Sequence, residues 1–157
     1  MRLVLASLLI SSLVGCSASR HVTEVDRVEM RSSGWSAVDV DVSEGGKGHF
    51  HLSHPPPGGR NGSFSISPRQ FARLVARLQP FLEQAVPLTD ASARAFIERK
   101  CPKGTPVIID AGAIWVRWTG PGFDDHYMAD LGCDPRRNAA RNEELVSIFK
   151  SVPVPLD

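Results

Sequence analysis

Two neighbouring segments with a period of two residues most constrain what this chain can fold into. From Val38 to Ser43 valines alternate with aspartates, and from Lys47 to Ser53 apolar residues alternate with histidines. This period places one set of side chains on the buried face of a β-strand and the other set in water. The glycines at 45–46 supply a short turn between the two segments. A hairpin of this kind favours an antiparallel sheet with one solvated face.

Helical patterns follow the hairpin. Residues 67–70, Ser-Pro-Arg-Gln, combine the serine N-cap, early proline and third-position glutamine that begin a helix. Apolar residues recur at helical spacing as far as Leu82. Pro80 lies within this pattern and predicts a kink or a stop of the helix near Gln79. A second helix is predicted over residues 90–100. The last helix is predicted to begin at residues 134–135 and to carry an apolar stripe to position 152.

Other segments indicate further strands. Residues 106–109 and 114–118 predict a hairpin, residues 127–131 a further strand, and residues 64–66 a short one. Residues 54–62 contain three prolines and an Asn-Gly pair, which predict irregular chain ending in a turn.

Because the strands come in runs rather than alternating with helices, the sequence predicts an α+β fold. We expect an antiparallel sheet of about five or six strands with two or three helices packed on one face. The hydrophobic content of 42% supports a real core, and the length fits a single domain over residues 22–157.

The first sixteen residues have the character of an export signal. Arg2 precedes an apolar run over residues 3–10, which serines interrupt well short of the about 20 residues of a membrane-spanning helix. The segment ends in Leu13-Val14-Gly15-Cys16, which resembles the lipobox of bacterial lipoprotein precursors. An uncleaved anchor, a buried N-terminal helix and ordinary secretory cleavage are the alternatives.

The resemblance implies that a signal peptide, residues 1–15, is removed and that Cys16 is lipidated, with residues 16–21 as a tether. Two or three acyl chains would hold the protein on a membrane without a transmembrane helix. Ser17 stands where an aspartate would retain many such proteins at the inner membrane. We therefore expect a location on the periplasmic face of the outer membrane.

Assigning Cys16 to lipid leaves Cys101 and Cys133. The periplasm is oxidising, so a disulfide between these two cysteines is the expected state. Closing the loop 101–133 predicts a stabilisation of about 3.5–4 kcal/mol. Two free thiols and half of a metal site are alternatives, and no CxxC spacing supports the metal site.

The charge balance excludes one class of partner. The chain has 18 basic and 17 acidic side chains, and loss of Arg2 with the signal peptide leaves 17 of each. A neutral mature chain has no net field to attract nucleic acid.

His49 and His51 are the candidate metal ligands. Alternate residues of a strand point to the same side, so two imidazoles could chelate zinc or copper from one face. His54 or His126 would complete the site if a loop folded back. The alternative is that solvent-facing strand positions are simply polar.

Two further groups are candidates for chemistry or recognition. Asp124, Asp125 and His126 are predicted to lie in a Gly-Pro loop and could form an acid/base pair or a metal corner, although such loops are rich in aspartate for turn reasons alone. Trp115 and Trp118 lie three residues apart and face opposite sides of a regular strand. One is expected in the core, and the other is a candidate contact for a partner.

The sequence therefore predicts a lipid-anchored cell-envelope protein with a binding or structural role, no cofactor, and an envelope protein or glycan as partner. A metal-binding module that uses His49 and His51 is the first alternative. A hydrolase of envelope polymers, with residues 124–126 in a cleft, is the second.

Overall fold

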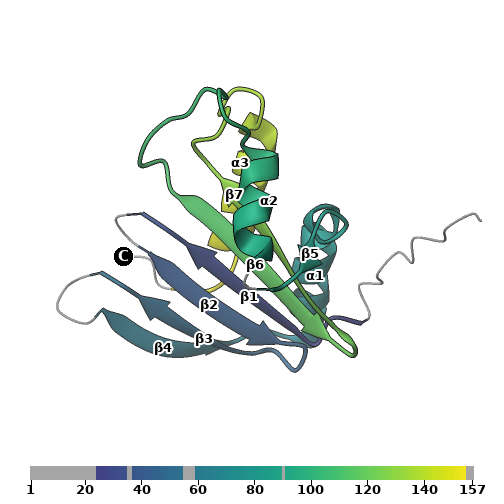
Figure 1. The fold of residues 1–157 in the computed structure, drawn as a ribbon. Helices are drawn as coiled ribbons and strands as arrows, with labels where there is room; N and C mark the ends of the chain where they lie inside the picture. The colour runs from purple at the N-terminus through teal and green to yellow at the C-terminus, as the bar shows by residue number, and fades with distance from the viewer. Residues whose placement is uncertain (1–23, 35–36, 55–58, 90, 155–157) are drawn as a thin grey trace, which may run out of the picture.

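The computed structural model describes residues 24–34, 37–54, 59–89 and 91–154. In these residues one antiparallel sheet of seven strands has the order β4-β3-β2-β1-β6-β7-β5, with three helices packed against it (Figure 1). The strands are β1 (Arg27–Ser32), β2 (Val38–Ser43), β3 (Lys47–Leu52), β4 (Arg60–Ser65), β5 (Val86–Pro87), β6 (Ala113–Gly120) and β7 (Phe123–Asp130). The helices are α1 (Pro68–Leu82), α2 (Ser92–Lys100) and α3 (Ala139–Lys150).

Alternation along the strands gives the sheet two unlike faces. Val28 of β1 pairs in register with Val42 of β2 and Trp118 of β6, and all three are fully buried. The next residue of β1, Glu29, points the other way, beside Arg117 of β6. We call the apolar side the covered face and the polar side the open face. In Figure 1 no helix lies in front of β4, β3, β2 and β1.

Helices α1 and α3 lie across the covered face. The Ser67 hydroxyl oxygen accepts a hydrogen bond from the Gln70 N–H, and the Gln70 side-chain oxygen accepts one from the Ser67 N–H at 2.8 Å, which confirms the predicted helix start. Of the predicted kink or stop near Gln79, the stop is wrong, because α1 continues through Pro80 to Leu82. Phe81 and Leu82 are buried there, and their packing outweighs the local cost of the proline.

Aromatic rings fill the part of the covered face formed by β3 and β4. The ring of Phe64 lies on Gly48 and that of Phe50 on Gly62, where an added Cβ would come within 2.2 and 2.3 Å of ring atoms. Glycine is needed at both positions because the rings occupy the space of a side chain. The Asn-Gly pair, predicted as a turn, therefore lies inside β4.

Helix α2 closes the β7 edge of the sheet. The ring of Phe96 lies 5.9 Å from the ring of His126 and 5.3 Å from that of Tyr127. Neighbouring residues of a strand point to opposite faces, so Phe96 reaches both sides of β7. A disulfide between Cys101 and Cys133, with Cα atoms 5.8 Å apart, joins the end of α2 to the chain after β7, as predicted.

The α+β class and the antiparallel sheet are confirmed, but the strand number and the helix placement differ from the prediction. Seven strands replace five or six because β1 and β5 were not predicted. Residues 106–109, predicted as a strand, form only the isolated bridge of Val107 with Cys133. Helix α2 packs at an edge, so only α1 and α3 share one face.

None of the helices in the described ranges combines the length and the apolar character that a membrane span requires.

Candidate functional site

Charged side chains on the open face pair with one another. Arg117 donates to both carboxylate oxygens of Asp124, from Nε at 2.7 Å and from Nη2 at 2.6 Å, and lies 3.4 Å from Glu29. These bonds hold the pKa of the Asp124 carboxyl below its usual range and raise the pKa of Arg117. Arg27 similarly contacts Asp41 at 3.1 Å. Most charges of this face are thus neutralised within the protein.

His49 and His51 lie side by side on the open face, as their spacing predicts, and each has a neighbour of its own. His49 Nδ1 is 3.7 Å from a carboxylate oxygen of Asp41, and His51 Nδ1 is 2.7 Å from the side-chain oxygen of Asn61. The described part of the chain contains no cluster of three or more histidine, cysteine, aspartate or glutamate side chains that could hold a metal ion.

The structure does not bring Asp124, Asp125 and His126 together. They are consecutive residues of β7, not of a loop, and Asp125 points to the covered face with 1% of its surface exposed. Asp124 is held by Arg117, and His126 is fully buried beside Phe96. Burial lowers the pKa of the His126 imidazole, which favours its neutral form.

The two tryptophans lie on opposite faces. Trp118 is fully buried on the covered face. Trp115 is half-buried on the open face, where the guanidinium of Arg31 lies 4.9 Å from the ring centroid. That cation occupies one side of the ring, and Arg31 in turn lies 3.5 Å from Asp39. Trp115 is therefore already engaged with its neighbours on the sheet.

A site that sequence reasoning missed lies in the loop of residues 102–112, which we call the distal loop. Its three consecutive apolar residues Val107, Ile108 and Ile109 are 54%, 56% and 82% exposed. They are the only large apolar residues so exposed in the described ranges. Contiguous exposed apolar side chains are typical of interaction sites.

Backbone bonds hold the distal loop in place. The Ile108 N–H donates to the carbonyl of Gly132 at 2.9 Å, and the Asp134 N–H donates to the carbonyl of Pro106 at 2.8 Å. Gly132 is required at this contact, since an added Cβ would come within 2.1 Å of the Ile108 carbonyl oxygen. The loop therefore presents its apolar side chains from a fixed backbone.

Basic residues lie near these apolar residues along the chain. Lys103 is exposed in the loop itself, and Arg136 and Arg137 are exposed just after Asp134, whose backbone bonds to the loop. Asp110 is the exposed acidic residue of the loop. Counted along the chain, three exposed basic residues and one exposed acidic residue accompany the apolar centre of the site, and we call these four residues its rim.

The distal loop and the start of the described chain lie at opposite ends of the sheet. The Asp26 N–H donates to the carbonyl of Thr119 near the end of β6, whereas the loop leads into the beginning of β6 at Ala113. The eight residues of β6 span about 26 Å at about 3.3 Å each.

Comparisons of the chain with protein-family models, with curated proteins and with solved structures gave no match.

Proposed function

We propose that this chain is a lipid-anchored protein of the bacterial cell envelope that binds another envelope protein through its distal loop and performs no catalysis. Its signal peptide would be residues 1–15, and its lipidated residue Cys16, on the periplasmic face of the outer membrane. The Cys101–Cys133 disulfide supports this proposal, because such bonds persist in oxidising compartments.

The observation that carries the binding role is the exposure of Val107, Ile108 and Ile109 on a backbone fixed by hydrogen bonds. Removing exposed apolar surface from water favours association by about 25 cal/mol per Å² before the costs of binding are subtracted. A flexible loop would lose conformational entropy on binding. Because backbone hydrogen bonds already fix this loop, that cost is smaller here.

Charge at the rim indicates the chemistry of the partner. Lys103, Arg136 and Arg137 would meet acidic side chains, and the apolar centre would enter an apolar depression. We therefore propose a protein partner with an apolar pocket and an acidic rim. The open face is a weaker candidate, because its charges already have partners within the protein.

The position of the loop fits a tethered protein. Even fully extended, residues 16–24 reach about 29 Å, so the near end of the sheet stays within this distance of the bilayer. The distal loop lies about 26 Å further along β6. The loop would therefore be able to reach well beyond the surface of the anchoring membrane.

The anchor is tested by replacing the lipidated residue. We expect Cys16→Ser to accumulate as a precursor that retains residues 1–15 and lacks acyl chains, measured by mass spectrometry of the membrane fraction. A variant that is cleaved before residue 16 and fractionates as wild type would refute the lipobox assignment.

The binding role is tested by a photo-crosslinking residue at position 109 in the full-length protein in cells. We expect a discrete adduct with one protein, which disappears when Arg136→Glu and Arg137→Glu are added. A crosslinker at His54, which is exposed in another loop, is the matched control and should give no such adduct.

Two outcomes would contradict the proposed partner. An adduct with twice the mass of the chain would identify self-association, and an adduct that survives the two arginine substitutions would exclude an acidic rim. Far-ultraviolet circular dichroism should be unchanged in all variants, because the substituted side chains are exposed.

A further inference from the structure

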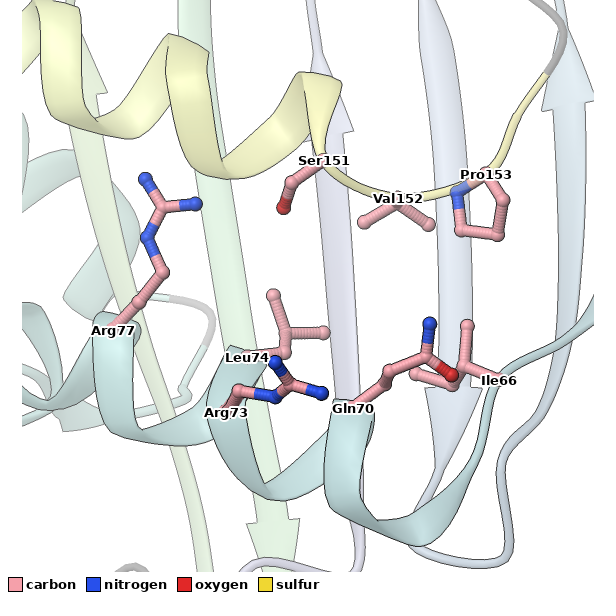
Figure 2. Close-up of a pocket in the computed structure, with 8 residues that line it drawn as sticks. All are labelled: Ile66, Gln70, Arg73, Leu74, Arg77, Ser151, Val152 and Pro153. Atoms are coloured by element: carbon pink, nitrogen blue, oxygen red, sulfur yellow. The ribbon is translucent and has the colours of Figure 1, made fainter.

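A groove separates α1 from the chain that follows α3. Figure 2 shows side chains from α1 and from the chain just after α3 facing each other across it. It encloses about 300 Å³, within the range of small-molecule sites. Its lining residues are Ile66, Gln70, Arg73, Leu74, Arg77, Ser151, Val152 and Pro153.

The walls of the groove are mainly apolar. Leu74 and Val152 are buried core residues that line it from opposite sides, and Ile66 and Pro153 continue the apolar lining at one end. Figure 2 shows Leu74 and Val152 pointing toward each other across the groove. A slender apolar group lying between α1 and residues 151–153 would therefore contact apolar atoms on both sides.

The two arginines of the groove differ in their partners. Arg77 is fixed by Glu144, at 2.9 Å, and by the Ser147 hydroxyl, at 3.1 Å. Arg73 is exposed and donates only from Nε, to the carbonyl of Arg69 at 3.4 Å. In the described residues no carboxylate pairs with Arg73. Its remaining guanidinium N–H groups are thus available to an anion at the mouth of the groove.

We propose that this groove binds an anionic amphiphile, with a single acyl chain along the apolar walls and a carboxylate or phosphate head group on Arg73. This site is separate from the distal loop and does not depend on the proposed function. Charge-assisted bonds from a guanidinium to an anionic oxygen are among the stronger protein hydrogen bonds. The neutral Gln70 amide beside Arg73 offers a further donor to the head group.

The groove also offers a matched pair of arginines for a test. Arg69 and Arg73 are both exposed on α1, and in the described residues neither is paired with a carboxylate. Arg73 lines the groove and Arg69 does not. Arg73→Gln and Arg69→Gln therefore remove the same charge from the same helix and differ in their position relative to the site.

The experiment is isothermal titration of a chain that starts at Ser17, with dodecanoate as the probe. This chain retains the whole buried core, which extends from Val25 to Val152. We expect saturable binding of one dodecanoate per chain, with dodecanol and dodecyltrimethylammonium at least about tenfold weaker. Arg73→Gln should weaken dodecanoate binding about tenfold or more, and Arg69→Gln should leave it unchanged.

A second substitution tests the acyl chain site. Ser151→Leu places a larger side chain at the groove wall and should weaken dodecanoate binding without changing the charge. Sedimentation with vesicles of phosphatidylglycerol, compared with phosphatidylcholine, distinguishes the source of the ligand. If Arg73→Gln loses vesicle binding and Arg69→Gln keeps it, the head group is a bilayer phosphate. If dodecanoate binds and the vesicles do not, the ligand is a free fatty acid.

The proposal is overturned if neither dodecanoate nor phosphatidylglycerol vesicles bind. It is equally overturned if dodecanol binds as tightly as dodecanoate, or if Arg69→Gln weakens binding as much as Arg73→Gln. The last result would mean general attraction of anions to α1 rather than a site in the groove.

Discussion

The covered and open faces are built from alternate residues of the same strands, yet they contribute to the fold in different ways. On β6, Trp118 is fully buried, and its neighbour Arg117 holds Asp124 on the other side. Burial of a large apolar side chain contributes several kcal/mol, whereas ion pairs open to solvent contribute about 1 kcal/mol or less. The covered face therefore supplies the stability, and the open face supplies a solvated surface with its charges neutralised.

This difference bears on where function lies. A polar sheet face looks like a binding surface in the sequence, but its arginines, aspartates and histidines contact one another. The exposed apolar residues Val107–Ile109 and the exposed Arg73 of the groove lie away from the open face. Substitutions on the two faces should therefore differ in their effect on stability.

The two tryptophans of β6 give the most direct test. Trp118→Ala should lower the free energy of unfolding by about 3–5 kcal/mol, because it leaves a cavity under α1 and α3. Trp115→Ala should cost about 1–2 kcal/mol, through the lost contact with Arg31 and partial packing. Urea unfolding followed by circular dichroism measures both. Similar losses in the two variants would refute the assignment of the faces.

At the β7 edge, α2 buries the open-face residue His126. The Cys101–Cys133 disulfide joins the end of α2 to the chain after β7. Replacing Cys101 and Cys133 together by alanine should lower the free energy of unfolding by about 3.5–4 kcal/mol. The same loss should follow when reductant is added to the wild-type protein and should be absent when it is added to the variant. An unchanged urea midpoint in reductant would contradict a stabilising disulfide.

His126 should make stability depend on pH. Burial lowers the pKa of its imidazole, so between that lowered pKa and about 6.5 the unfolded chain binds a proton that the folded chain does not. The free energy of unfolding should therefore fall as pH drops below about 6.5, by at most about 1.4 kcal/mol per pH unit.

Urea midpoints at pH 7.5 and pH 5.5 measure this effect. The difference between the two midpoints should shrink in His126→Gln, in which position 126 no longer titrates. It should persist in His54→Gln, which changes an exposed histidine. An equal reduction in both variants would show that burial of His126 is not the cause.

The smallest effect is expected at the ion pairs of the open face. Asp124→Asn should lower the free energy of unfolding by about 1 kcal/mol at low salt and by less in 1 M salt, where charges are screened. Double-mutant cycles with Arg117→Gln isolate the pair. A coupling energy of several kcal/mol that salt does not alter would mean that the open face is less solvated than described here.

Much of the fold follows from local patterns in the sequence. The alternation in β2 and β3 and the Ser67 cap predicted their elements, because each signal lies within a few residues of the structure that it specifies. The same alternation is present in β1, where Val28 and Met30 lie between charged residues, so this strand too has a local signal. By contrast, β5 has two residues, too few to show a period.

The candidate sites were less predictable, because they depend on contacts between distant segments. Residues 106–109 have the composition of a strand, but pairing with residues 131–134 leaves Val107–Ile109 in solvent. The flanking prolines and glycines, and the short run of only three apolar residues, are the features of the sequence that indicate a loop here rather than a strand. Burial of His126 depends on α2, and the groove at Arg73 depends on the chain after α3, so no local pattern specifies either.

The antiparallel pairing of β1 with β6 has a mechanical consequence. The described chain begins at one end of these strands, and the distal loop leaves from the other end. A pulling force between Val25 and Ile109 therefore acts along the strands and loads the whole β1–β6 ladder at once in shear. Pulling across the strands would instead open hydrogen bonds one after another. The sheet therefore resists tension between its two ends better than tension across its strands.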